Sequence, residues 1–130
     1  MESDLIKKYS SATGKKLILL DYDGTLVGYT TKPDQALPSE RVITLIRKLS
    51  QKPFLKVVII TGRSHLDIEK LIGNLQIDIV AEHGAMIREN QKWEKRFNDD
   101  GLWKNAILLV MRKFISEHPD SFIEEKIFSL

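Results

Sequence analysis

Two short apolar runs stand out in the first half of the chain. Residues 17–20 (LILL) and residues 57–60 (VVII) are entirely hydrophobic, and each run ends abruptly at polar residues. Runs this short and uniform predict strands buried on both faces, because a half-buried strand alternates apolar and polar positions. Between the two runs, Ser39 is predicted to cap a helical segment that Pro53 ends. The apolar face of that predicted helix comprises Val42, Ile43, Leu45, Ile46 and Leu49.

A second helical pattern follows the second apolar run. Ser64 is a favoured helix-capping residue, and Asp67 lies three positions later, as in a capping box. Residues 77–81 predict a third strand, and a hairpin is predicted to begin at residues 85–87 and to return near Trp93. Strands joined by helical segments indicate βαβ units. The pattern therefore predicts an α/β fold with a parallel sheet that is covered on both faces.

The ends of the chain follow other patterns. Residues 2–11 predict a short helix, and a long helix is predicted from Leu102 to Glu117, where Pro119 prevents its continuation. Residues 122–128 predict a strand with charged residues inside it. We therefore expect three segments: a lead or linker helix over 1–16, a core portion over 17–90, and the start of a second subdomain over 91–130.

Composition narrows the class of protein. The chain has 130 residues, of which 42% are hydrophobic and 29% are charged, as in one globular domain. Its net charge of +2 gives no support for nucleic-acid binding. The sequence has no cysteine, which excludes disulfides and a thiolate nucleophile and fits a cytoplasmic setting. No apolar run approaches the roughly 18–20 residues of a membrane span. We expect neither a nucleic acid nor a membrane as partner.

The strongest chemical signal is the segment 21–25 (DYDGT), directly after the first strand. In open α/β sheets, sites form beyond the carboxyl ends of strands. Alternation along an extended chain places Asp21 and Asp23 on one side. One carboxylate can attack phosphorus, and the other can protonate the leaving oxygen. Together they suit Mg²⁺, which prefers oxygen ligands. Gly24 lets the backbone approach an anion, and Thr25 adds a donor.

This segment also has simpler interpretations. An acidic turn after a strand is common, and Asp-Gly alone predicts only a turn. A calcium loop fits poorly, because with Asp21 as the first position Lys32 stands at position 12, where such loops have glutamate. The glycine-rich nucleotide-binding motifs do not occur. A receiver-type signalling domain needs another aspartate after the third strand, where this sequence has residues 81–83 (AEH).

A second polar segment, residues 61–63 (TGR), follows the second strand in the same way. Because parallel strands end at the same edge of a sheet, the Thr61 hydroxyl is expected near the acidic segment. The helix that starts at Ser64 has free N–H groups that favour an anion. Taken alone, the segment has a simpler explanation: Gly62 permits a turn, Ser64 caps a helix, and Arg63 is a surface or bracing charge.

These motifs resemble those of the haloacid-dehalogenase-type phosphatases, whose first motif is similar to DYDGT and whose second is similar to TGR. Residues 81–85 (AEHGA) are similar to the trehalose-6-phosphate phosphatases, and residues 124–130 (EEKIFSL) resemble the substrate-facing strand of their cap. Residues 5–9 resemble the junction before the phosphatase domain of fused synthase–phosphatase proteins. The resemblance implies a Rossmann-like parallel sheet of a haloacid-dehalogenase-type core, here incomplete, with the beginning of an α/β cap.

The resemblance also implies roles for individual residues. Asp21 would be the nucleophile and Asp23 the general acid and base. The Asp21 carboxylate and the Asp23 main-chain carbonyl would hold Mg²⁺. Thr61 would bind the transferring phosphoryl group, together with main-chain N–H groups near Gly24 and Gly62.

Two charged residues near the C-terminal end are implied to bind the substrate. Glu124 and Lys126 would hydrogen-bond sugar hydroxyls, since residues two apart share one face of a strand. Without the resemblance, they would be an ordinary charged pair on an exposed face. Glu82 and His83 serve here only to identify the family, and His83 is expected to be structural.

The resemblance is incomplete. Such phosphatases have a third motif, a lysine, and a fourth, an acidic cluster that completes the Mg²⁺ site. Both lie beyond the cap, and neither occurs up to Leu130. Because loss of one preorganised stabilising group typically costs roughly 10²–10³ in rate, we expect residues 1–130 alone to be weakly active or inactive.

The expected function is Mg²⁺-dependent hydrolysis of trehalose 6-phosphate to trehalose and phosphate, through an aspartyl-phosphate. The expected partners are a small sugar phosphate and either the missing C-terminal half or a fused synthase domain. Two alternatives remain open: a phosphatase for another sugar phosphate, and a catalytically incomplete module that binds a ligand or partner.

Overall fold

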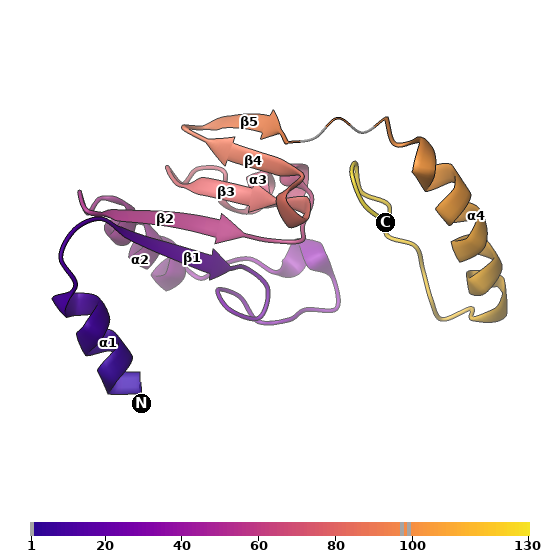
Figure 1. The fold of residues 1–130 in the computed structure, drawn as a ribbon. Coiled ribbons are helices and arrows are strands. Elements are labelled where there is room, and N and C mark those ends of the chain that lie inside the picture. Colours follow the sequence, from indigo (N-terminus) through magenta and orange to yellow (C-terminus); the bar gives the residue numbers. More distant parts are fainter. Residues whose placement is uncertain (1, 97, 99) are drawn as a thin grey trace.

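The computed structural model describes residues 2–96, 98 and 100–130. Among these residues, five strands form one sheet in the order β1-β2-β3-β4-β5 (Figure 1). The parallel strands are β1 (Lys16–Asp21), β2 (Leu55–Ile60) and β3 (Asp78–Ala81). An antiparallel hairpin of β4 (Met86–Glu89) and β5 (Lys92–Lys95) continues the sheet from β3. The predicted parallel strands and the hairpin that returns near Trp93 are confirmed.

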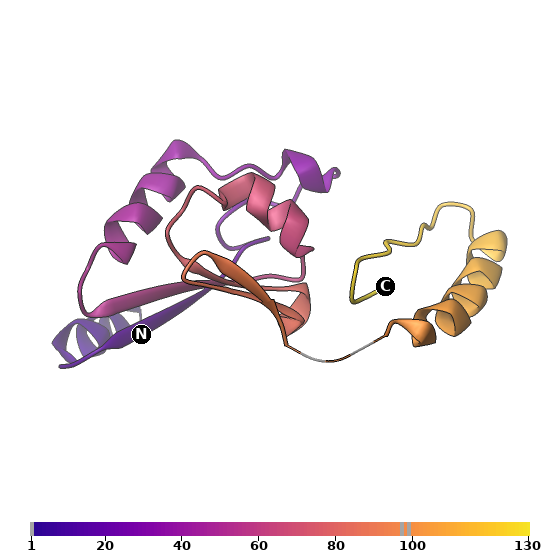
Figure 2. The ribbon, with the colours of Figure 1, turned by 90° about the horizontal axis from the view of Figure 1, so that it is seen from above.

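Two helices cover one face of the sheet. These are α2 (Glu40–Ser50) and α3 (His65–Ile72), which lie on the same side in Figure 2. Both predicted caps are present: the Ser39 hydroxyl accepts the Val42 N–H, and the Ser64 hydroxyl accepts the Asp67 N–H at 3.1 Å. The core between these helices and the sheet consists mainly of aliphatic side chains, among them Ile46, Ile59, Ile68, Ile72 and Ile79.

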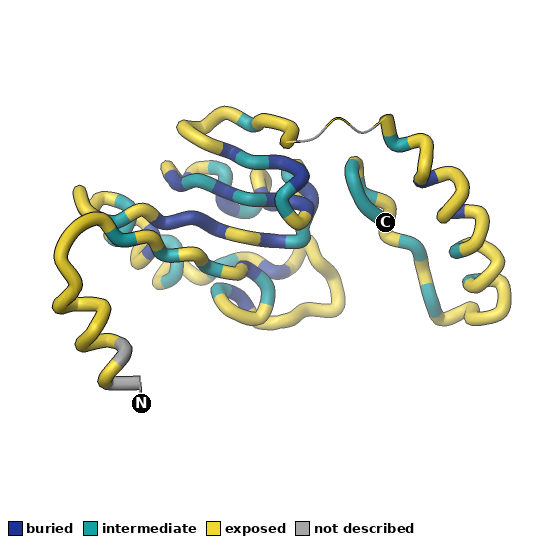
Figure 3. The backbone as a smooth tube through the Cα atoms, viewed as in Figure 1, coloured by how far each residue is buried: buried dark blue, intermediate teal, exposed yellow. Residues whose placement is uncertain are grey.

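The other face of β1 is open (Figure 3). Leu17 is 57% exposed and Leu19 is 55% exposed, although both lie in the apolar run. The prediction that this strand is buried on both faces is therefore wrong. The physical reason is that α2 and α3 cover the same face, and β1 forms one edge of the sheet that the described residues build.

Helices at the two ends of the chain agree with the pattern. The N-terminal helix is α1 (Glu2–Ser11), and α4 (Leu102–Glu117) has the predicted bounds. Two short 3₁₀ helices, η1 (Pro33–Gln35) and η2 (Glu82–Gly84), lie in loops beyond the strands. None of the helices in the described part of the chain is long and apolar enough to cross a membrane.

The strand predicted over residues 122–128 is not formed. This segment runs back from α4 toward the carboxyl ends of the strands (Figures 1 and 2). Lys104 of α4 donates to the carbonyls of Lys126 and Ile127, and the Phe128 N–H donates to the Glu82 carboxylate. Because no described strand pairs with it, side chains bond its backbone groups instead.

The division into segments 1–16, 17–90 and 91–130 stays a prediction. The sheet itself continues through β5 to Lys95. α4 stands apart from the sheet, with the C-terminal segment between them (Figures 1 and 2).

Candidate active site

The two acids lie at the carboxyl end of β1. Asp21 is the last residue of that strand and pairs in register with Ile60, the last residue of β2. Asp21 is exposed and Asp23 is partly exposed, whereas Tyr22 between them is fully buried. This alternation turns both carboxylates away from the core. The Thr25 hydroxyl donates to Asp21 Oδ2 at 3.4 Å.

Tyr22 anchors the acidic segment from the inside. Its hydroxyl donates to the Ala36 carbonyl at 2.7 Å. Burial raises the pKa of Tyr22 to about 12, because the phenolate would be poorly solvated there. The Tyr22 carbonyl accepts the N–H groups of Leu26 and Val27. A buried side chain bonded in this way fixes the backbone from which both acids project.

Gly24 makes the turn after the acids. Its φ of +83° lies in the left-handed region that favours glycine, and a Cβ there would come within 2.6 Å of the Tyr29 hydroxyl oxygen. The Gly24 N–H donates to the Val27 carbonyl at 2.8 Å. Its visible role is therefore conformational, and phosphate binding by Gly24 stays a prediction.

Thr61 directly follows β2 and is 3% exposed. Its N–H donates to the Val80 carbonyl of β3, and its carbonyl accepts the His83 N–H. Thr61 Oγ1 accepts the Arg63 N–H at 3.1 Å, a bond that leaves the hydroxyl proton for another partner. Gly62 follows, and a Cβ there would come within 2.6 Å of the His83 ring, so a larger residue would have to displace that exposed side chain.

Arg63 is the site residue that the sequence interpretation missed. Its Nε donates to Asp23 Oδ2 at 2.8 Å, and its Nη2 donates to Asp23 Oδ1 at 2.7 Å. Nη1 donates to the Pro33 carbonyl at 2.7 Å. The hydrogen bonds to Asp23 raise the pKa of the Arg63 guanidinium. The signal in the sequence was the TGR segment, which follows a strand parallel to β1. That position indicated that Arg63 lies near the acidic segment, but it did not indicate that Arg63 donates two hydrogen bonds to Asp23.

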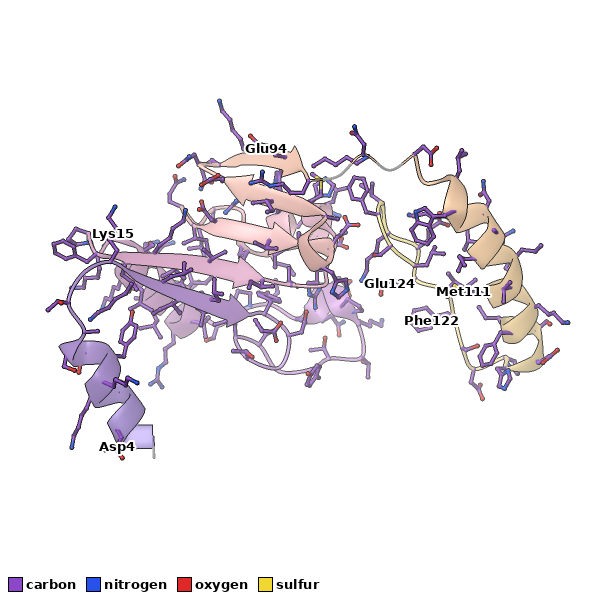
Figure 4. The ribbon with its side chains drawn as sticks, in the orientation of Figure 1. Asp4, Lys15, Glu94, Met111, Phe122 and Glu124 are labelled. Atoms are coloured by element: carbon purple, nitrogen blue, oxygen red, sulfur yellow. The ribbon has the colours of Figure 1, made fainter. Side chains whose placement is uncertain are left out.

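Glu124 and Lys126 reach the same edge of the sheet although they lie in no strand. Lys126 Nζ lies 3.3 Å from Glu124 Oε2 and donates to the Gly62 carbonyl at 3.0 Å. Glu124 is labelled in Figure 4, on the segment between the sheet and α4. Both residues border an open cleft of about 340 Å³, lined by Asp23, Tyr29, Thr30, Pro33, Gly62, Arg63, His83, Glu124 and Lys126.

The cleft joins some predicted site residues and leaves others beside it. Asp23, Gly62, Glu124 and Lys126 line it, whereas Asp21 and Thr61 are not among its lining residues. Two segments 64 residues apart in sequence thus meet where the parallel strands end.

Two oxygen donors for a metal ion lie at the end of β1. The Asp21 carboxylate and the Asp23 carbonyl are oxygen donors, which suits a hard cation. The Asp23 carboxylate is engaged by Arg63. Within residues 2–96, 98 and 100–130, no group of three or more His, Asp or Glu side chains could hold a metal. The residues present therefore fit part of a Mg²⁺ site.

Two solved structures of phosphatases and related hydrolases share the fold of this chain. A haloacid dehalogenase-like hydrolase from B. subtilis matches 78% of this chain with a TM-score of 0.56 at 23% identity, which shows a shared fold. The C-terminal domain of trehalose-6-phosphate phosphatase from C. albicans matches 96% of this chain and 44% of its own, with a TM-score of 0.88 at 29% identity.

The sequence comparisons give the family. The trehalose-phosphatase family profile matches residues 19–130, and the chain belongs to that family. It is 35% identical over 127 residues to the trehalose-phosphatase of Saccharomyces cerevisiae, covering 94% of this chain and 14% of that protein. It is 32% identical over 124 residues to the bifunctional trehalose-6-phosphate synthase/phosphatase of Thermoproteus tenax, covering 95% of this chain and 17% of that protein. The chain thus spans a small part of these relatives.

Proposed function

We propose that this chain supplies the nucleophile half of a phosphatase site that hydrolyses trehalose 6-phosphate to trehalose and phosphate. The observation that carries the proposal is the register of β1 and β2, which brings Asp21 and Asp23 to the same edge as Thr61. Family membership supports the substrate, because relatives named as trehalose-phosphatases match nearly the whole chain.

The proposed reaction has two steps. In the first, an Asp21 carboxylate oxygen attacks phosphorus, the bond from phosphorus to the sugar oxygen breaks, and Asp23 gives its proton to that oxygen. In the second, Asp23 takes a proton from water as the water oxygen attacks phosphorus. The bond from phosphorus to the Asp21 oxygen breaks, which releases phosphate and restores the Asp21 carboxylate. The Thr61 hydroxyl proton would be donated to a phosphoryl oxygen.

The substrate would be held by groups of the cleft. Glu124 and Lys126 line it beside Asp23, and a carboxylate with an ammonium group can accept and donate hydrogen bonds to sugar hydroxyls. The Asp21 carboxylate and the Asp23 carbonyl would hold Mg²⁺, which when bound neutralises charge on the nucleophile and the phosphate.

We propose that groups from outside residues 1–130 complete the site. Support comes from the metal donors, which are fewer than three side chains in the described part of the chain, and from the greater length of the relatives. The source would be further sequence of the same phosphatase domain or a fused synthase domain. We also propose a cytoplasmic location, because a chain without cysteine has no disulfides that would need an oxidising compartment.

A substrate panel tests the proposal. Phosphate release would be measured with trehalose 6-phosphate, glucose 6-phosphate and sucrose 6-phosphate, with and without a chelator, in a chain that carries these residues within the relatives' full phosphatase domain. Asp23→Asn should slow turnover by about 10²–10⁴-fold, because proton transfer to the leaving oxygen is lost. Equal rates on all three esters would favour a broader sugar phosphatase.

The incomplete metal donor set favours one alternative for residues 1–130 alone, a module that binds a sugar phosphate or a partner without turnover. Calorimetry with trehalose 6-phosphate and a phosphate-release assay on the 130-residue chain separate the two. Binding without turnover supports the module, and robust Mg²⁺-dependent turnover contradicts it.

A further inference from the structure

The buried carboxylate of Glu82 takes no part in the proposed reaction. The Glu82 side chain is 0% exposed. Its Oε1 lies 3.3 Å from His65 Nδ1, and its Oε2 accepts the Phe128 N–H at 2.9 Å. A carboxylate removed from water is costly unless hydrogen bonds replace the lost solvation. At Glu82, one of the hydrogen bonds that replace solvation comes from Phe128, which lies 46 positions away in the sequence.

The backbone that carries this carboxylate has an uncommon conformation. Glu82 and His83 have φ values of 48° and 57°, in the left-handed region that residues with side chains rarely adopt. Such conformations persist where the surroundings hold them. Here the Glu82 N–H donates to the Arg63 carbonyl at 2.9 Å, and the His83 N–H donates to the Thr61 carbonyl at 3.3 Å. The turn is therefore attached to the TGR loop.

The partner that Glu82 contacts is the C-terminal segment, residues 124–128. Besides the Phe128 N–H bond to Glu82, Lys126 Nζ donates to the Gly62 carbonyl, and Lys95 Nζ lies 5.0 Å from the centre of the Phe128 ring. Because this segment forms no strand, no sheet ladder fixes its register. The bond to Glu82 joins the backbone of this segment to the core.

We propose that Glu82 is a positioning residue that docks residues 124–128 on the TGR loop. Its carboxylate holds the Phe128 N–H, and this sets where Glu124 and Lys126 stand over the cleft. The consequence for substrate rests on the proposed function, whereas the docking itself is measurable without turnover.

Amide hydrogen exchange on the 130-residue chain tests the docking. Glu82→Met removes the acceptor at similar size, and Glu82→Gln keeps an oxygen acceptor. The Phe128 amide should exchange at least about tenfold faster in Glu82→Met, because a hydrogen bond to a charged group is lost. It should stay within about threefold of the parent in Glu82→Gln. The sheet amides of Ile59 and Ile79 should not change in either variant.

Glu89→Met is the matched control, since it removes an exposed carboxylate from β4. An unchanged Phe128 amide in Glu82→Met would overturn the proposal, as would faster exchange throughout the sheet in Glu82→Gln. If Glu82→Met does not fold, Phe128→Pro removes the donor from the segment instead. Residues 122–127 should then exchange faster while the sheet stays protected, and unchanged exchange there would overturn the proposal.

Kinetics separate positioning from a general structural role. In a form that turns over trehalose 6-phosphate, Glu82→Met should raise KM for that ester at least about tenfold, while kcat/KM for phenyl phosphate, which has no sugar, stays within about twofold. Equal losses on both esters would contradict positioning. If trehalose 6-phosphate is not hydrolysed but the Phe128 amide still responds to Glu82→Met, the proposed function fails and the docking stands.

Discussion

At the residue scale, the two acids of the DYD segment have different surroundings. Asp21 is exposed and has the Thr25 hydroxyl at 3.4 Å, whereas both Asp23 oxygens accept bonds from Arg63. An accessible carboxylate suits attack on phosphorus, and the two bonds from Arg63 fix the orientation of the Asp23 carboxylate. The sequence predicted that both acids lie at this edge. The pair with Arg63 was not predictable, because Asp23 and Arg63 are 40 positions apart and meet only when β1 and β2 align.

Removing the Arg63 guanidinium should reduce turnover in a form that hydrolyses trehalose 6-phosphate. Arg63→Met leaves Asp23 without two bonds, and loss of an orienting partner typically costs about 10–100-fold. The measurement is kcat, with and without added guanidinium, which should restore part of the rate. Arg47→Met, on an exposed position of α2, is the control and should be neutral. Unchanged kcat in Arg63→Met would show that Asp23 does not depend on this pair.

Tyr22 predicts a loss of stability at alkaline pH. Burial raises its pKa from 10.0 to about 12, so the folded state holds the phenolic proton more tightly than the unfolded chain does. This contribution is complete below pH 10 and is lost as the pH rises from 10 through about 12.

Urea unfolding of the parent chain and of Tyr22→Phe, at pH 8 and at pH 11, measures this contribution. Tyr22→Phe should be less stable by about 1 kcal/mol at pH 8, because the bond to Ala36 is lost. It should lose less stability than the parent between the two pH values. A parallel decline of both proteins would contradict the assignment to Tyr22.

At the element scale, local signals predicted most helices and strands. Apolar runs predicted β1 and β2, and caps with apolar faces predicted α2 and α3. These signals can be read from residues that are close together in the sequence. The strand predicted over 122–128 failed because a strand also needs a partner, and side chains such as Lys104 and Glu82 bond this segment instead. The segment still brings Glu124 and Lys126 to the cleft, which followed from the resemblance rather than from periodicity.

The cap of α3 gives a prediction for this element. Ser64 accepts the Asp67 N–H at 3.1 Å and donates to Asp67 Oδ2 at 2.6 Å. Ser64→Ala should therefore lower the free energy of unfolding by about 1 kcal/mol, as measured in urea. Ser116→Ala near the end of α4 should change it by less than about 0.5 kcal/mol. Equal effects of the two substitutions would count against a specific cap.

At the scale of the whole molecule, the two helices that pack on the sheet in the described part of the chain, α2 and α3, lie on the same face. Parallel sheets are usually covered on both, and here Leu17 and Leu19 of β1 are more than half exposed. The exposure of this face could not be predicted from the sequence, because an apolar run does not indicate whether helices cover one face of a strand or both. Large exposed apolar patches promote association.

The open face predicts that the 130-residue chain self-associates at high concentration. Leu17→Thr combined with Leu19→Thr should reduce light scattering and dye binding, because two exposed apolar side chains are removed. The free energy of unfolding should change by less than about 1 kcal/mol, since both positions are largely solvated. Loss of the folded state in the double variant would show that this face is covered in solution.

In the proposed hydrolysis of trehalose 6-phosphate, Asp21 would carry the phosphoryl group. The most direct measurement is phosphate release from that ester with Mg²⁺, in a chain that carries these residues within the relatives' full phosphatase domain. Asp21→Asn should lower the rate by at least about a thousandfold, and Asp120→Asn beyond α4 should leave it unchanged. Turnover retained in Asp21→Asn would contradict the claim.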